Sequence, residues 1–252
     1  MSALLIEYEK RLSKRDIDAD PNIEKKDFSF ENLKFKANGE IKPYFGLTCI
    51  VWIDPKTKLY KELVAYQGAV KKALEKAGLV DFFCFLDPKP FHMTICDIVA
   101  SPMPIQSEKA RVFIDKIGDA FSRTAKTEAI HCQVNAVGLA TTLSALVRFE
   151  ENELLRVLAL EQRLKDAAQV NLRNFTGHIS LAYLVSAPGN ATGKIREILR
   201  AHKRASFGNL TFSQFDLTSF TDMNTYIPLL SIDFEENQIT QYSERASSIS
   251  QG

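Results

Sequence analysis

The sequence lacks the features of secreted, membrane-spanning and zinc-stabilised proteins. Its four cysteines form no Cys-x-x-Cys pair, and each lies in a strand-like apolar stretch, which favours buried free thiols in a reducing compartment. No apolar run approaches the roughly 18 residues that span a bilayer. The first ten residues become charged too soon for a signal peptide. We therefore expect a cytoplasmic protein without membrane contact.

The sequence also lacks a strong charge of either sign and an internal linker. Its formal net charge is +1, so no broad basic field is available to hold long nucleic acid. A small or terminal phosphate-bearing substrate, such as a nucleotide or a short RNA, fits this balance better. No Gly-, Pro- or Ser-rich stretch divides the 252 residues, of which 45% are hydrophobic. One globular domain, monomeric and with a sizeable core, is expected.

What the sequence does contain is one short pattern that occurs twice. The first motif, His92-Met93-Thr94, and the second motif, His178-Ile179-Ser180, are both His-x-(Thr/Ser) in apolar surroundings. The match continues through apolar positions to a proline at the same relative place in each copy. A single His-x-Thr carries little information, but two in matching frames indicate a duplicated unit that brings two imidazoles and two hydroxyls together.

Hydrophobic periodicity predicts strands and helices around each motif. The expected strands are 45–53, 82–85, 91–99, 129–138, 143–149, 177–185, 209–220 and 226–234. The expected helices are a short one within 1–12, one capped by Asp54 and ending near Gly78, and ones from 107, over 151–169 and over 194–204. These elements predict an α+β fold of two similar lobes, in which mainly antiparallel sheets line a central cleft and helices lie outside. Residues 1–40 form a helix-and-loop extension, 41–234 the bilobal domain, and 235–252 a polar, solvated tail.

Strand alternation assigns the motif side chains to faces. Residues i and i+2 of a strand share a face, so His92 projects with Thr94, and His178 with Ser180. The same alternation places a small residue, Cys96 or Ala182, on the polar face beside each histidine. Imidazoles and hydroxyls are costly to bury without partners, so a wet cleft that accepts a ligand is expected.

Two imidazoles and two hydroxyls suit phosphodiester cleavage without a metal or cofactor. One neutral histidine removes a proton from water or a ribose hydroxyl, and the other, as imidazolium, protonates the departing oxygen. The hydroxyls of Thr94 and Ser180 can donate hydrogen bonds to the non-bridging oxygens, where charge develops. His92, His178, Thr94 and Ser180 are therefore the candidate catalytic residues.

The paired motifs resemble the two signature motifs of the two-histidine (2H) phosphoesterase superfamily, which includes LigT-like RNA ligase/cyclic phosphodiesterases and cyclic nucleotide phosphodiesterases. The resemblance covers about residues 41–234, and the stretches 39–46 and 91–97 are most similar to a little-characterised branch. It implies a LigT-like bilobal fold, no metal, and activity on 2′,3′-cyclic phosphates or related ribonucleotide phosphodiesters.

Five further residues are candidates for substrate binding. Tyr44 and Phe91 can stack on a base, although packing in the core or at its rim explains them equally well. Lys89 and Arg148 can hold a phosphate, although a solvated or salt-bridged place is the simpler interpretation. Tyr183 is a candidate as well, although alternation places it opposite His178, in the core.

The two remaining histidines are interpreted as structural. His131 lies on a polar strand face, and His202 ends a helix, where a positive charge is favourable.

Other functions stay open at this point. The same chemistry also suits an RNA 3′-end exonuclease, or a phosphodiesterase for 2′,5′-oligoadenylate or a cyclic dinucleotide. A non-catalytic phosphate- or nucleotide-binding module would use the same cleft, but binding alone does not need two proton-transfer groups. A zinc site built on the two motif histidines lacks evident further ligands.

Overall fold

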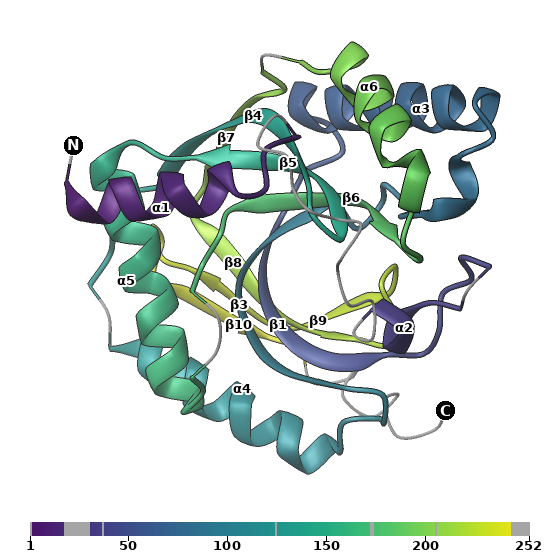
Figure 1. The fold of residues 1–252 in the computed structure, drawn as a ribbon. Helices are drawn as coiled ribbons and strands as arrows, with labels where there is room; N and C mark the ends of the chain where they lie inside the picture. Colours follow the sequence, from purple (N-terminus) through teal and green to yellow (C-terminus); the bar gives the residue numbers. More distant parts are fainter. Residues whose placement is uncertain are drawn as a thin grey trace.

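A computed structural model describes residues 2–17, 31–36, 38–123, 125–171, 174–204 and 206–242. Its strands are β1 Phe45–Trp52, β2 Phe83–Phe85, β3 His92–Ser101, β4 Ile130–Leu139, β5 Thr142–Arg148, β6 His178–Leu184, β7 Gly208–Phe212, β8 Gln214–Phe220, β9 Tyr226–Asp233 and β10 Gln238–Gln241 (Figure 1). Its helices are α1 Ala3–Ser13, α2 Glu31–Lys34, α3 Lys58–Lys76, α4 Ser107–Ser122, α5 Glu151–Ala168 and α6 Thr192–Ala201, with 3-10 turns at Val80–Phe82 and Gly189–Ala191. The predicted α+β class is confirmed.

The strands form one antiparallel sheet that divides into two lobes at β3 and β6. The ten-stranded sheet has the order β10-β9-β8-β1-β3-β6-β5-β4-β7, and β2 pairs with β6 off this path. The first lobe is β10 to β3, and the second is β6 to β7 together with β2. A single residue pair, Met93 with Ile179, joins β3 to β6. The two predicted sheets are therefore continuous, and the two motif strands form the seam between them.

The long helices pack on the sheet in two groups, and they share the main core with Met93 and Ile179. Helix α4 packs against β9 and α5, and α5 also packs against β3 and β4. Helix α3 packs against β7 and α6 on the second lobe, although it directly follows β1 of the first (Figure 1). The C-terminal strand β8 returns to pair with β1. Each lobe is thus completed by elements from the other half of the sequence.

Two predictions about the limits of elements need correction. The expected strand 209–220 is broken at Ser213, because β7 pairs with β4 in the second lobe whereas β8 pairs with β1 in the first. The expected N-cap Asp54 is replaced by Thr57, whose Oγ1 accepts a hydrogen bond from Tyr60 N at 3.2 Å. The expected end of this helix at Gly78, where φ is +68°, is confirmed.

The predicted domain limits stay a prediction, but two elements assigned to the flanking segments pack on the lobes. Strand β10 lies within the expected solvated tail and pairs with β9. Helix α1 lies in the expected extension, and its Tyr8 and Leu12 are fully buried. Residues 243–252 of the tail lie outside the described residues.

The four cysteines are free and buried, as predicted. Burial raises the pKa of the Cys84 thiol to about 11 and that of Cys96 and Cys132 to about 12. Such thiols carry almost no thiolate at neutral pH and are poor nucleophiles. Separately, none of the helices in the described ranges is long and apolar enough to cross a membrane.

Candidate active site

The seam between the lobes brings both motifs onto one face of the sheet. Pairing of Met93 with Ile179 in an antiparallel ladder sets His92 beside Ser180 and Thr94 beside His178. Met93 and Ile179 are fully buried, whereas the four motif side chains are half-buried on the opposite face. The two paired residues are also equivalent in the sequence repeat, which is the arrangement that a two-fold axis between them produces.

A β-bulge follows each motif at the same relative position. Ile50 pairs with Thr94 but Cys49 pairs with Cys96, so Ile95 has no partner in β1. Leu181 is likewise skipped, because Ser144 pairs with Ser180 and Leu143 with Ala182. A bulge places two successive residues on one side of the sheet. The burial of β3 and β6 accordingly begins with the same sequence: half-buried, buried, half-buried, buried, buried.

These bulges overturn two predictions that rested on strict alternation. Cys96 and Ala182 do not lie beside the histidines; both belong to the main core. Asp97 and Tyr183 are turned to the histidine face instead. Tyr183 packs in a second, smaller apolar cluster with Tyr44 and Tyr226, and not in the main core where alternation placed it. The two apolar residues in a row after each motif were the sequence signal for the bulge.

The backbone holds both imidazole rings in the same way. Nδ1 of His92 lies 2.7 Å from the carbonyl oxygen of Pro90, and Nδ1 of His178 lies 2.8 Å from that of Thr176. In each case the acceptor is the carbonyl two residues earlier. A carbonyl only accepts, so each Nδ1 carries the proton, and Nε2 of each neutral ring remains available to take up or deliver a proton.

The two histidines differ in their electrostatic surroundings. The pKa of His178 is lowered to about 3, first by burial and next by the nearby positive charge of Arg15, with smaller effects of His92 and Lys34, while the hydrogen bond to Thr176 opposes the shift. Burial also lowers the pKa of His92, but the hydrogen bond to Pro90 and the negative charge of Asp97 oppose this. The imidazolium form is therefore easier to reach at His92 than at His178.

Aromatic side chains enclose His92. Its ring centre lies 4.6 Å from that of Tyr226 and 6.1 Å from that of Trp52, which meets it edge-on. Trp52 is fixed in turn by its Nε1, which donates to the buried carboxylate of Asp216 at 2.7 Å. Both rings are half-buried, so part of their surface faces solvent.

Lys34 of α2 contacts both lobes near the motifs. Its Nζ lies 5.4 Å from the ring centre of Tyr44, next to β1, and 5.2 Å from that of Tyr183 on β6. Its positive charge contributes to the lowered pKa of His178. These contacts bring two predicted substrate-binding residues, Tyr44 and Tyr183, to the motif face together with a cation that sequence reasoning had missed.

The other three predicted substrate-binding residues do not join this group. Phe91 is buried in the main core, with its ring 6.0 Å from that of Tyr60 on α3. Lys89 is exposed in the turn before β3, and its backbone N–H donates to Asp87 at 2.9 Å. Arg148 is half-buried and forms an ion pair with Glu9 of α1. The simpler interpretation of Arg148 as salt-bridged is confirmed.

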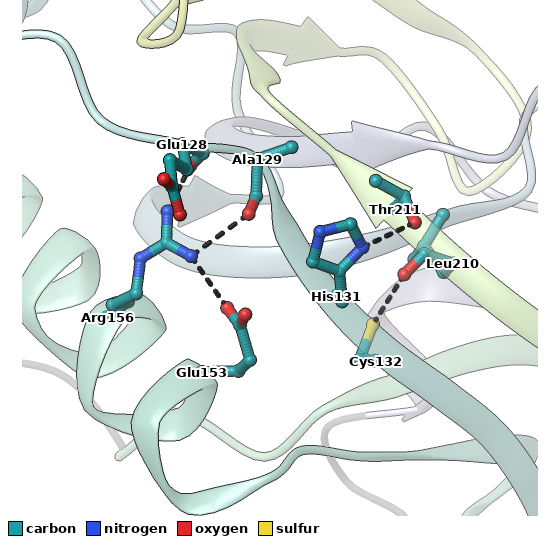
Figure 2. Close-up of polar contacts among 8 residues, drawn as sticks. All are labelled: Glu128, Ala129, His131, Cys132, Glu153, Arg156, Leu210 and Thr211. Carbon is teal, nitrogen blue, oxygen red and sulfur yellow. Dashed lines mark hydrogen bonds and ion pairs between the residues drawn. The ribbon is translucent and has the colours of Figure 1, made fainter.

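His131 and His202 have the structural places predicted for them. His131 on β4 meets Thr211 of β7 through Nδ1 at 2.9 Å, on the exposed side of the outer strands (Figure 2). Figure 2 also shows Arg156 of α5 bound to Glu153 and to the carbonyl groups before β4. Nδ1 of His202 lies 2.9 Å from the carbonyl oxygen of Ile198 at the end of α6.

Five residues near the motifs were not singled out from the sequence. They are Arg15, Lys34, Trp52, Asp97 and Tyr226, contributed by five different segments of the chain. Only Asp97 carried a local signal, since it follows the doubled apolar pair after the first motif. Among the residues that the structure describes, no group of three or more His, Cys, Asp or Glu side chains is placed to hold a metal ion.

Comparison with known proteins relates part of the chain to a described family. The family model for the 2H-phosphodiesterase domain of unknown function (DUF1868) matches residues 34–105, which include the first motif. No curated protein sequence matches the chain.

Solved structures share the fold at low sequence identity. A conserved protein of unknown function, ATU0111 from Agrobacterium tumefaciens, is 18% identical with a TM-score of 0.57, over 78% of this chain and 89% of that one. LigT from E. coli, complexed with NADP+, is 13% identical with a TM-score of 0.50, over 76% and 99%. TT0787 of Thermus thermophilus is 14% identical with a TM-score of 0.50, over 75% and 98%. These structures confirm the LigT-like fold, and the family model over residues 34–105 bears out the resemblance to the 2H phosphoesterases.

Proposed function

We propose that this protein is a metal-independent phosphodiesterase that acts on a 2′,3′-cyclic phosphate or a related ribonucleotide or RNA-end phosphodiester. The observation that carries the proposal is the pair of imidazoles on one face of the β3–β6 seam, each with Nδ1 bound to a backbone carbonyl and Nε2 left for the substrate. Such a pair can remove one proton and deliver another across a single phosphate.

The surroundings of the two rings favour different roles for them. His178, beside Arg15 and Lys34, is the general base, because burial and then the nearby cations lower its pKa and keep it neutral. His92, beside Asp97, is the general acid, because the carboxylate favours its imidazolium form. Thr94 and Ser180 donate hydrogen bonds to the non-bridging phosphate oxygens. The phosphate's own negative charge raises the pKa of both histidines when the substrate binds.

Tyr183 and Lys34 form the proposed contact surface for the nucleoside and its phosphates. The half-buried ring of Tyr183 offers stacking and hydrogen bonding, and Lys34 offers a positive charge, whereas Tyr44 is only 3% exposed and supports Lys34 from the core. The nucleotide present in the LigT structure, NADP+, supports a nucleotide as the substrate class. A monomer acting in the cytoplasm, without a cofactor, completes the proposal.

The test is turnover of a defined substrate panel in excess EDTA, with products resolved by phosphorus NMR. The panel contains 2′,3′-cyclic mononucleotides, 2′,5′- and 3′,5′-dinucleotides, a cyclic dinucleotide and RNA with a cyclic-phosphate end. We expect ring opening of the 2′,3′-cyclic phosphates that is lost in His92→Ala and His178→Ala and kept in the control His131→Ala, which changes a surface histidine.

Other results of the same panel separate the alternatives. Turnover confined to the linear or cyclic dinucleotides would replace the substrate class and keep the chemistry. Binding without turnover of any member would instead indicate a nucleotide-binding module. Activity that requires an added divalent ion would contradict the metal-independent mechanism.

A further inference from the structure

The peptide group that joins Thr176 to Gly177, just before His178, is hydrogen-bonded through both its carbonyl and its N–H. Its carbonyl, from Thr176, lies 2.8 Å from Nδ1 of His178, and its N–H, from Gly177, donates to the hydroxyl of Tyr8 at 3.2 Å. The Tyr8 hydroxyl donates in turn to the carbonyl oxygen of Val147 on β5 at 2.8 Å. A continuous chain of hydrogen bonds therefore runs from β5 through Tyr8 to the imidazole ring.

The equivalent peptide before His92 is held by its own turn. The carbonyl of Pro90 lies 2.7 Å from Nδ1 of His92, and the N–H of Phe91 donates to the carbonyl of Pro88 at 2.9 Å. Phe91 and Gly177 occupy the same position of the repeat. The first motif thus supports its histidine from within the four preceding residues, whereas the second motif uses a side chain from the N-terminal helix.

Tyr8 is held firmly enough to serve as such a support. It is fully buried, with its ring stacked on Phe175 at 6.0 Å and edge-on to Phe149 at 6.0 Å. Its helix is fastened to the second lobe by the ion pair between Glu9 and Arg148. The segment after the helix is fastened by a hydrogen bond from Leu139 N to the carbonyl of Arg15 at 2.8 Å.

Gly177 shows how closely the hydroxyl approaches this peptide. A Cβ atom at this position would lie 2.6 Å from the Tyr8 hydroxyl and 3.0 Å from Cβ of Val147. Any residue other than glycine would therefore push the hydroxyl away from the Gly177 N–H.

We propose that Tyr8 is a positioning residue for the reaction: by holding the Thr176–Gly177 peptide, its hydroxyl fixes the ring orientation and the Nδ1–H tautomer of His178. Helix α1 is then part of the catalytic centre, although it lies outside the matched family region. Where turnover is the readout, the inference rests on the proposed function.

The experiment compares Tyr8→Phe with Tyr66→Phe in the full chain. Tyr66 is a matched control, because it is also buried and its hydroxyl has no hydrogen-bond partner among the described residues. We expect Tyr8→Phe to lower kcat about tenfold with little change in KM, since small misplacements of a catalytic group are costly. Tyr66→Phe should keep wild-type turnover.

A second readout does not depend on activity. Long-range proton–nitrogen NMR of the imidazole side chains should show His178 as the Nδ1–H tautomer in the wild type and in Tyr66→Phe. In Tyr8→Phe the His178 signals should move towards a mixture of tautomers, while those of His92 stay in place. If the His178 signals and kcat in Tyr8→Phe equal those of Tyr66→Phe, the inference is wrong.

A double variant separates positioning from a general loss of stability. Gly177→Ala should lower kcat more than Tyr8→Phe, and Gly177→Ala/Tyr8→Phe should recover part of the loss, because the shortest contact of the new Cβ is removed. A double variant less active than either single variant would contradict the proposal. Failure of the wild type on every panel substrate would overturn the proposed function but leave the NMR comparison valid.

Discussion

The first and second motifs place their histidines identically but support and charge them differently. Both motif strands share one order of burial, one bulge position and one hydrogen bond from Nδ1 to a carbonyl two residues earlier. They differ in the groups that support each ring and in the charges near it. His92 has a local proline turn and Asp97, whereas His178 has Tyr8, Arg15 and Lys34. The duplication thus accounts for the geometry, and unrelated segments make the two rings chemically distinct.

The difference between the motifs is what an acid–base pair requires. Two identical imidazoles would share one pKa, and neither would be preferred as acid or base. Cations beside His178 and a carboxylate beside His92 move the two apart in the direction that assigns the roles. The following predictions test where this comparison holds, from the largest expected effect to the smallest.

The largest effect is expected from removing either histidine. His92→Ala and His178→Ala should each lower kcat by about 10²–10⁴, the range for one positioned acid or base. The double variant should lose far less than the product of the two, because the groups act as a unit. Steady-state kinetics on the best panel substrate provides the measurement. Near-wild-type turnover of both single variants would eliminate the acid–base assignment.

A smaller effect is expected from the hydroxyls. Thr94→Ala and Ser180→Ala should each lower kcat by about 10²-fold or less, consistent with the loss of one donor to a developing anion. Thr94→Ser should keep most of the activity, because the donor remains. Equal activity of Thr94→Ala and the wild type would remove Thr94 from the site.

The smallest effect is expected from the charges that distinguish the rings, and it is seen in the pH profile. With His178 as base and His92 as acid, kcat/KM should rise as His178 loses its proton and fall as His92 loses its own. Because both pKa values lie below the usual 6.5, the optimum should be acidic. Asp97→Asn lowers the pKa of His92 and should shift the alkaline limb of the profile to lower pH. Arg15→Gln raises the pKa of His178 and should shift the acid limb of the profile to higher pH.

The two substitutions should therefore narrow the active pH range from opposite ends. Asp115→Asn and Arg123→Gln, on the exposed side of α4 and at its end, are matched controls for the change in charge. Both limbs should keep their wild-type positions in these controls. If Asp97→Asn moved the acid limb instead, the roles of the two histidines would be reversed.

Local patterns in the sequence were sufficient for most of the strands and helices and for the choice of the four catalytic candidates, but they did not predict α2 or β10. The rule that strand residues alternate between faces failed at the β-bulges, where Ile95 and Leu181 have no partner in the neighbouring strand. It therefore assigned Cys96, Ala182 and Tyr183 to the wrong face. The same rule merged β7 and β8 into one strand. The chain breaks at Ser213 and the two strands lie in different lobes, but the apolar pattern continues through the break.

The rest of the site could not be predicted because it depends on contacts between distant segments. Lys34 reaches Tyr183 from a four-residue helix, and Tyr8 reaches Gly177 from the N-terminal helix. Nothing in the local sequence of either residue marks these contacts. Arg148, conversely, had a local signal as a charge in an apolar strand, but its partner Glu9 lies on the same N-terminal helix as Tyr8.

The most direct measurement is a crystal structure of the protein with a nucleoside 2′-monophosphate, the ring-opened form of a 2′,3′-cyclic phosphate. We expect the phosphate at the β3–β6 seam, with its oxygens within hydrogen-bond distance of Nε2 of both His92 and His178 and of the hydroxyls of Thr94 and Ser180. A phosphate bound away from the seam, or a complex in which only one of the two histidines reaches it, would contradict a paired-histidine active site.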